Sequence, residues 1–194
     1  NQQVMGGCFY LSPDLYIPFV GVTLSMPWYL YLVLCVFIIV GADNAVNLTD
    51  GKDGLASGCT IFSTLTYATF AYLMGHKIFA NYLNIPFVPT VSEAVVFASA
   101  IGGACIGFLW HNCHPAAMFM GDTGSMFIGG ATVGMAMLLR QPFMLLLIAF
   151  TCVMSSVSVI LQRYYFKLTR KLTGTPKRLF KMSPLHHHFE LCGM

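Results

Sequence analysis

The sequence predicts an all-α membrane protein, a transmembrane helical bundle with about five membrane helices. Of its 194 residues, 57% are hydrophobic and only 9% are charged, whereas a soluble domain carries roughly 25% charged residues. Uncharged stretches occur at 15–42, 54–76, 94–121, 123–139 and 141–162. Most are long enough to cross a bilayer, which takes about 20 residues per helix. A transmembrane β-barrel would alternate apolar and polar residues, but 30–40 and 143–150 are apolar throughout.

The elements of a single membrane domain, 1–194, follow from these runs and their breakers. Residues 1–20 contain two glycines and two prolines, and we expect an extracytoplasmic loop or an irregular hairpin there. Pro142 suits the start of the last helix, where a missing N–H costs little. Glycines in the fourth helix allow close helix packing. The predicted helices are 24–41, 55–74, 92–110, 125–139 and 143–162.

The basic residues predict the orientation of this bundle. Seven of the ten Lys and Arg residues fall within 163–194, after the last predicted helix. Because cytoplasmic loops carry an excess of positive charge, this basic segment is expected in the cytoplasm. Counting back through five crossings places 42–54 and 111–124 on the same face, and 75–91 outside. Most of the polar side chains therefore fall on one side of the membrane.

The first polar cluster is GADNAVNLTDGKDGLASG at Gly41–Gly58. Asp50 and Asp53 are three residues apart and would share a face on a helical turn. Carboxylates beside a membrane can hold Mg²⁺, which prefers oxygen ligands and keeps several waters for a phosphate-bearing substrate. Asn47 adds donors and acceptors. The alternative is that both Asp-Gly pairs only form turns and that an Asp caps the next helix.

The second cluster is FLWHNCHPAAMFMGDTGS at Phe108–Ser125, and it places Asp122 just before a predicted helix. Exposed N–H groups and the positive end of the helix dipole could face an anion there. The carboxylate could also hold a metal whose other ligands are phosphate oxygens. The alternative is an ordinary helix cap by Asp122 or a neighbouring hydroxyl. Phe119 could stack on a base, although aromatic residues are common at membrane interfaces.

The third cluster is RLFKMSPLHHHFE at Arg178–Glu190, with three consecutive histidines. Neighbours differ by about 100° around a helix, so His186, His187 and His188 cannot all face one way. After Pro184 we expect a loop or a helix start. The imidazoles could donate hydrogen bonds to phosphate or nucleotide oxygens. A purification tag would be longer and terminal, and no Cys or His partner stands at a familiar zinc spacing.

Three segments together resemble one protein family. They are NAVNLTDGKDGLA (Asn44–Ala56), FLWHNCHPAAMFMGDTGS (Phe108–Ser125) and SPLHHHFE (Ser183–Glu190). They are similar to the signature segments of the bacterial phospho-N-acetylmuramoyl-pentapeptide transferases, a branch of the polyprenyl-phosphate N-acetylhexosamine-1-phosphate transferases. The likeness spans about residues 15–192, and three long motifs in the same order are far more specific than any one of them.

The resemblance implies a multi-pass enzyme of the bacterial cytoplasmic membrane that acts at the cytoplasmic face in peptidoglycan synthesis. Members transfer phospho-N-acetylmuramoyl-pentapeptide from its UDP carrier to undecaprenyl phosphate, with Mg²⁺ as cofactor, and form lipid I and UMP. The expected partners are therefore these two substrates and the lipid bilayer. A second copy of the chain is a further candidate, because members often pair, and no nucleic-acid partner is expected.

The resemblance also implies a role for particular residues. Asp122 would be the Mg²⁺ ligand in the catalytic centre. Asn112 and the histidines His186–His188 would serve catalysis or bind substrate phosphate. The residues expected to line the uridine and nucleotide pocket are Asn47, Asp50, Asp53, Phe119 and Gly121.

The chain also departs from the family pattern. Members have roughly twice as many membrane helices, so we expect this chain to be part of a longer protein and to be inactive by itself. The paired aspartates of the family do not occur in it. Lys52 stands where an apolar residue is usual, and Asp43 is an extra carboxylate. Two alternatives stay open: a related transferase that accepts UDP-N-acetylglucosamine, and a non-enzymatic membrane scaffold, which leaves the one-sided polar residues unexplained.

Overall fold

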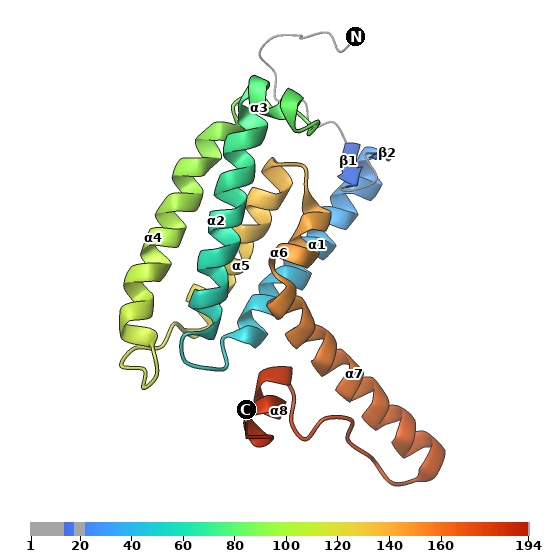
Figure 1. The fold of residues 1–194 in the computed structure, drawn as a ribbon. Helices are drawn as coiled ribbons and strands as arrows, with labels where there is room; N and C mark the ends of the chain where they lie inside the picture. Colours follow the sequence, from blue (N-terminus) through green and yellow to red (C-terminus); the bar gives the residue numbers. More distant parts are fainter. Residues whose placement is uncertain (1–13, 18–21, 194) are drawn as a thin grey trace.

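The computed structural model describes residues 14–17 and 22–193 and shows a bundle of helices from which the last long helix projects (Figure 1). In chain order the elements are β1 (Asp14–Ile17), β2 (Val22–Ser25), α1 (Trp28–Thr49), α2 (Leu55–Gly75), α3 (Lys77–Tyr82), η1 (Val91–Glu93), α4 (Ala94–Asn112), α5 (Gly121–Leu138), η2 (Pro142–Met144), α6 (Leu145–Ile148), α7 (Phe150–Thr173) and α8 (Leu185–Leu191).

A short antiparallel hairpin precedes the helices. β1 pairs with β2 so that Asp14 lies opposite Ser25 and Ile17 lies opposite Val22. The sequence predicted an all-α membrane protein with a loop or hairpin at 1–20; the helical fold class is supported, and the small sheet is a hairpin that begins within that segment and extends to Ser25. Residues 1–13 and 18–20 of that predicted segment lie outside the described residues.

The core of the bundle lies between α1, α2, α4 and α5. α2 packs along α4, while α1 packs along α5 and α7. Gly129 permits the close approach of α5 to α1, because a Cβ there would lie 2.9 Å from the Cα of Asp43. This supports the packing role predicted for glycine in this helix. Small and aliphatic side chains fill the interior, among them Ala45, Val46, Ala71, Ala98, Val133 and Ala136.

Two helical units are long and apolar enough to cross a membrane, namely α1 and the continuous unit Val91–Asn112. The bent pair Pro142–Ile148 and Phe150–Thr173 would be a third. The structure thus supports a helical membrane protein, while the predicted number of about five spans is not confirmed among the described residues. Serine and threonine make α2 less apolar, yet the Thr60, Ser63 and Thr64 hydroxyls all donate to carbonyls of their own helix.

The first helix runs further than predicted. We expected it to end at 41, but α1 continues to Thr49. Its polar last turns bond to their own helix: the Asn44 amide donates to the carbonyl of Val40 and the Thr49 hydroxyl donates to that of Ala45. The cluster that begins at Gly41 is therefore partly helical and not a loop. Likewise α5 begins at Gly121, before the predicted 125.

The last predicted helix, 143–162, is broken. The η2 and α6 segment is bent by 85° from α7, and the break falls at Ala149, whose backbone leaves the helical region. α7 then continues to Thr173 and ends at Gly174, which has a left-handed φ of 71°. A glycine takes this conformation without the steric cost other residues incur. The helix therefore carries its basic residues away from the bundle (Figure 1).

The chain returns from α7 and places α8 near the end of the bundle (Figure 1). Gln162 on α7 holds the returning segment, because its side-chain carbonyl accepts hydrogen bonds from the backbone N–H groups of Leu179 (3.1 Å) and Phe180 (2.9 Å). The Ser158 hydroxyl accepts a further bond from the N–H of Leu185 at 3.0 Å. α8 is thus attached to α7 at its first residue.

Candidate functional site

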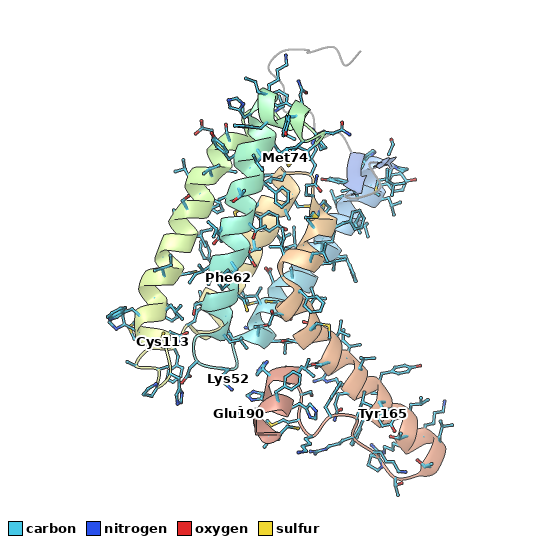
Figure 2. The ribbon with its side chains drawn as sticks, viewed as in Figure 1. Lys52, Phe62, Met74, Cys113, Tyr165 and Glu190 are labelled. Atoms are coloured by element: carbon cyan, nitrogen blue, oxygen red, sulfur yellow. The ribbon has the colours of Figure 1, made fainter. Side chains whose placement is uncertain are left out.

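Three segments far apart in the sequence meet at one end of the bundle. They are the turn 50–54 between α1 and α2, the loop 113–120 between α4 and α5, and α8. Figure 2 shows Lys52, Cys113 and Glu190 at this end and Met74 at the opposite end. All the predicted site residues lie on these three segments or on the helix ends beside them.

Asp122 lies in the first turn of α5, where a negative charge is favoured by the helix dipole. Its carboxylate does not cap the helix, which speaks against the alternative of an ordinary cap. Instead, Oδ1 accepts a hydrogen bond from the side-chain amide of Asn47 at 3.1 Å, and that amide also donates to the Ser125 hydroxyl at 3.1 Å. The end of α1 therefore orients the carboxylate at the start of α5.

Asp50 forms the second carboxylate of this centre. It ends α1, and residues 51–54 form turns, so the helical turn expected to align Asp50 with Asp53 is not present. Burial, followed by the negative charge of Asp122, raises the pKa of the Asp50 carboxyl. Two carboxylates that repel each other in this way favour a cation between or beside them.

The donor set at Asp50 and Asp122 suits Mg²⁺ and does not form a closed protein cage. In the part of the chain that the structure describes, no three His, Cys, Asp or Glu side chains converge on one point. Mg²⁺ commonly uses one or two protein carboxylates and completes its octahedron with waters and substrate phosphates. Asp122, oriented by Asn47, and Asp50 could therefore hold this ion when a phosphate supplies further oxygens.

Asp53 faces the neighbouring loop. Its Oδ2 lies 3.0 Å from Nδ1 of His114 and accepts a bond from the N–H of Ala116 at 3.3 Å. The His114 contact, followed by the Ala116 N–H, lowers the pKa of the Asp53 carboxyl. From the sequence, His114 was expected to be a packing or interfacial residue more often than a ligand; in the structure it helps to join the turn 50–54 to the loop 113–120.

Asn112 is buried, with 4% of its surface exposed. The polar atoms of its side chain form hydrogen bonds with other residues of the chain. Its carbonyl oxygen accepts from the N–H of Gly54 at 3.0 Å and from the Ser57 hydroxyl at 3.2 Å. Its amide donates to the carbonyl of Met118 at 2.8 Å. The geometry therefore shows a residue that fixes both loops of the site.

The three histidines lie at the start of α8, as the sequence allowed, and they face different ways. A Cβ on Gly51 would lie 3.0 Å from Nε2 of His186 and 3.4 Å from Nε2 of His187, so these two imidazoles lie over the turn. His187 also pairs with Glu190 at 3.4 Å. His188 turns away, and its Nδ1 accepts the N–H of Lys181 at 3.2 Å.

The ring nitrogens of His186 are available to bind a ligand. Both ring nitrogens are shielded from water, yet neither has a hydrogen-bond partner within the described residues. Burial, then the charges of His187 and Lys52, lowers the pKa of His186. The imidazole is therefore neutral at physiological pH, with one donor and one acceptor nitrogen.

Phe119 and Gly121 lie at the open edge of the site. The Phe119 ring is 77% exposed, which leaves its face free for stacking. Gly121 has a left-handed φ of 68° where the loop enters α5, with no atom within 4 Å of the position a Cβ would take. Sequence reasoning missed the hydroxyl and amide groups that hold these segments, namely Ser57, Ser125, Ser158 and Gln162, because such residues are common in helices and no motif marks them.

Comparison with known proteins agrees with this arrangement. The sequence model of glycosyl transferase family 4 matches residues 3–140. The chain is 46% identical to the phospho-N-acetylmuramoyl-pentapeptide-transferase of Desulfotalea psychrophila, over 98% of this chain and 53% of that protein. Proteins of the same name from Chloroherpeton thalassium (50% identical; 84% of this chain, 44% of that protein) and Leptospira biflexa (45%; 100% and 50%) also match.

The chain spans about half the length of the curated relatives it matches. Within that half, the match includes all three polar segments that meet at the candidate site. The family model alone extends over more than half of the chain and includes Asp50, Asn112 and Asp122. The resemblance carried by the three motifs is therefore confirmed, and the chain belongs to glycosyl transferase family 4.

Proposed function

We propose that the protein containing this chain transfers phospho-N-acetylmuramoyl-pentapeptide from UDP to undecaprenyl phosphate, forming lipid I and UMP at the cytoplasmic face of the bacterial inner membrane. The observation that carries this proposal is that the end of α1, which contacts Asp122 through Asn47, continues into the turn at Gly51 over which His186 and His187 lie. The names of the relatives support the sugar and peptide part of the substrate.

Asp122 and Asp50 would hold Mg²⁺, which when bound would neutralise the negative charge of the substrate phosphates. Asn47 keeps the Asp122 carboxylate oriented through its 3.1 Å hydrogen bond. Such a centre suits attack by a phosphate on a pyrophosphate, because charge on both anions must be screened before they can approach.

His186 and His187 would contact the substrate phosphates from above the turn. The two ring nitrogens of His186 are shielded and lack partners among the described residues, so a phosphate oxygen would satisfy a donor that is otherwise left unpaired. Phe119, exposed at the edge, would stack on uracil, while Asp53 and Gly121 border the same loop. Asn112 serves this site by positioning the two loops, since its polar atoms are already bonded.

Asp122→Asn in the full-length protein tests the proposal. We expect the release of UMP from UDP-N-acetylmuramoyl-pentapeptide to fall at least about 100-fold, because a metal-held carboxylate contributes several kcal/mol to phosphoryl transfer. Thermal unfolding should change little, since Asp122 is exposed. Glu93→Gln, at the opposite end of the bundle, is the matched control and should retain activity. Unchanged turnover in Asp122→Asn would favour a scaffold instead.

Exchange of the sugar nucleotide tests the substrate. With undecaprenyl phosphate as acceptor, we expect UMP release from the muramoyl-pentapeptide nucleotide and none above background from UDP-N-acetylglucosamine. The opposite preference would assign the protein to the related N-acetylglucosamine transferases. Removal of Mg²⁺ with a chelator should abolish the reaction, and its restoration by Mg²⁺ should depend on Asp50 and Asp122.

A further inference from the structure

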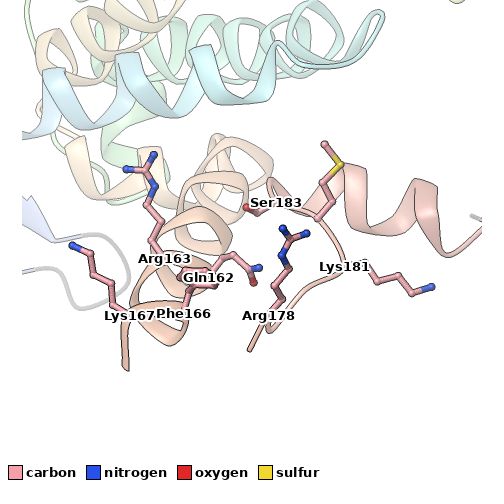
Figure 3. Close-up of a pocket in the computed structure, with 8 residues that line it drawn as sticks. Gln162, Arg163, Phe166, Lys167, Arg178, Lys181 and Ser183 are labelled. Atoms are coloured by element: carbon pink, nitrogen blue, oxygen red, sulfur yellow. The ribbon is translucent and has the colours of Figure 1, made fainter. Parts of the chain in front are cut away.

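A cavity of about 540 Å³ lies outside the carboxylate centre, between α7 and the returning segment 177–183 (Figure 3). Four of its lining side chains are cations, and none is acidic. In Figure 3, Arg163 and Lys167 extend from α7 and Arg178 extends from the returning segment. The charged lining residues are Arg163, Lys167, Arg178 and Lys181.

No carboxylate among the described side chains forms a salt bridge with these cations. The ammonium of Lys181 donates to the backbone carbonyl of Leu191 at 3.3 Å. The salt bridges within the described residues involve only histidines, so Arg163, Lys167 and Arg178 have no carboxylate partner there. A concave site with positive charges on both walls favours an anion, and guanidinium groups match the geometry of phosphate.

Apolar side chains also line this cavity, namely Phe166 and Met182, which are 36% and 48% exposed, and they indicate where the anion comes from. The opposite face of α7 is apolar as well. Leu161, Tyr164, Leu168 and Leu172 follow the spacing of one helical face on α7, and they are 47%, 68%, 41% and 75% exposed. On the returning segment, Leu179 and Met182 are also about half exposed, at 49% and 48%. A helix that leaves the bundle with one apolar face and one basic face is typical of a segment lying in the lipid interface.

We propose that this basic cavity binds the phosphate headgroup of an anionic bilayer phospholipid. The phosphate would be held by Arg163 and Arg178, while the acyl chains would leave the cavity past the apolar side chains of Phe166 and Met182. Undecaprenyl phosphate carries a similar group, but its phosphate must reach the carboxylate centre to react, and no residue that lines the cavity belongs to that centre.

A lipid held here would also steady the triple-histidine helix. The backbone N–H of Lys181 donates to Nδ1 of His188 at 3.2 Å, and its side chain contacts the end of α8. Occupancy of the cavity would therefore restrain the segment from which α8 begins. The proposal stands on the cavity and its surroundings and does not depend on the transfer reaction.

Lipid binding to two charge-matched double variants tests the proposal. Arg163→Gln with Arg178→Gln removes one guanidinium from each wall, whereas Arg170→Gln with Lys171→Gln removes two cations of α7 that do not line the cavity. The full chain in nanodiscs would be examined by native mass spectrometry with increasing phosphatidylglycerol. We expect the cavity variant to bind phosphatidylglycerol at least about tenfold more weakly than the control, because hydrogen bonds to a charged group are lost. If phosphatidylglycerol binding were weakened equally in both double variants, binding would depend on general surface charge, and the proposal would be overturned.

Two further arms use the unaltered protein, so they remain decisive if the cavity variant fails to fold. A photoactivatable phosphatidylglycerol should cross-link to the peptides that contain 162–167 or 177–183, and cross-links elsewhere alone would contradict the assignment. Inorganic phosphate at millimolar concentration should not displace the lipid, and its displacement would show a site for a soluble anion. Stronger competition by undecaprenyl phosphate than by phosphatidylglycerol would assign the cavity to the prenyl lipid and overturn our choice.

Discussion

Asn112 and Asp53 lie in the candidate site, yet the chain itself already uses their polar atoms. Asn112 joins Gly54, Ser57 and Met118, while Asp53 joins the loop 113–120. Asp50, Asp122 and His186 differ, because a pair of like charges and two unpartnered ring nitrogens remain for a ligand. The polar residues of the three motifs therefore divide into those whose polar atoms are already used to hold the loops and those that are proposed to bind a ligand.

Replacement of Asn112 by Ala should destabilise the protein. It would remove the Asn112 partner of the buried Ser57 hydroxyl and of the partly buried Gly54 N–H and Met118 carbonyl, and we expect a loss of about 2–3 kcal/mol in the free energy of unfolding. Denaturant unfolding in detergent would measure the loss. Asn44→Ala is the control, because Asn44 is exposed and bonds only within its own helix; we expect a change within about 0.5 kcal/mol. Equal effects would remove the positioning role assigned to Asn112.

The contact of Asp53 with His114 should make stability depend on acid pH. Because the pKa of the Asp53 carboxyl is lower in the folded protein than its ordinary value of about 3.9, its ionised form stabilises the folded state above that pH. This contribution to the free energy of unfolding is lost as the pH falls through the folded-state pKa. His114→Ala removes the main cause of the lowering. We therefore expect the variant to unfold at a lower temperature than the wild type near pH 6, and the difference to shrink toward pH 3. His111→Ala should show no such convergence, and a gap that stays constant with pH would contradict the ion pair.

At the scale of elements, the site depends on how closely α8 approaches the turn after α1. Gly51 provides the room, because a Cβ there would already lie 3.0 Å from the His186 ring. α8 is bonded to α7 through Ser158 and to the returning segment through Lys181. A longer side chain at 51 would therefore move the histidines more readily than it would unfold the bundle.

Gly51→Leu tests this approach. In the full-length enzyme we expect transfer activity to fall at least about tenfold, since small displacements of catalytic groups lower rates strongly, with little change in the temperature of unfolding. Gly103→Leu on α4 is the matched control, because no atom lies within 4 Å of the Cβ position there. If both variants kept full activity, His186 and His187 would not act at this turn.

Uncharged runs in the sequence predicted where most helices lie. They did not predict where the helices end or where they bend. Long uncharged runs predicted α2 and α4 to within a few residues. The uncharged run ends at 42 and predicts a helix that ends at 41, whereas α1 continues to Thr49 because helical backbone carbonyls and α5 satisfy the polar side chains of Asn44 and Asn47. The 85° break at Ala149 lies inside an apolar run, so composition does not change there. The Asp53–His114 contact joins residues 61 positions apart, which no local pattern encodes.

For the whole molecule, the three polar segments lie at one end of the bundle, so the side of the membrane that this end faces can be tested. The predicted grouping of the 42–54, 111–124 and triple-histidine segments is confirmed by contacts between them. That this end faces the cytoplasm is a prediction from the basic residues of α7 and the segment after it. Cys113 and Cys192 are both exposed at the site end, while Lys77 marks the other end of α2.

A single-cysteine protein that keeps only Cys113 should therefore react with a membrane-impermeant maleimide in inside-out vesicles and not in intact cells. A protein that keeps only Cys192 should behave in the same way, because α8 lies at the same end of the bundle. Lys77→Cys in a cysteine-free background should show the reverse pattern. The physical reason is that a charged reagent cannot cross the hydrocarbon core, so labelling reports which end of each helix meets the outside. Labelling of Cys113 from outside would place the carboxylate pair away from the cytoplasmic nucleotide pool, and transfer from a UDP carrier by this site would then be untenable.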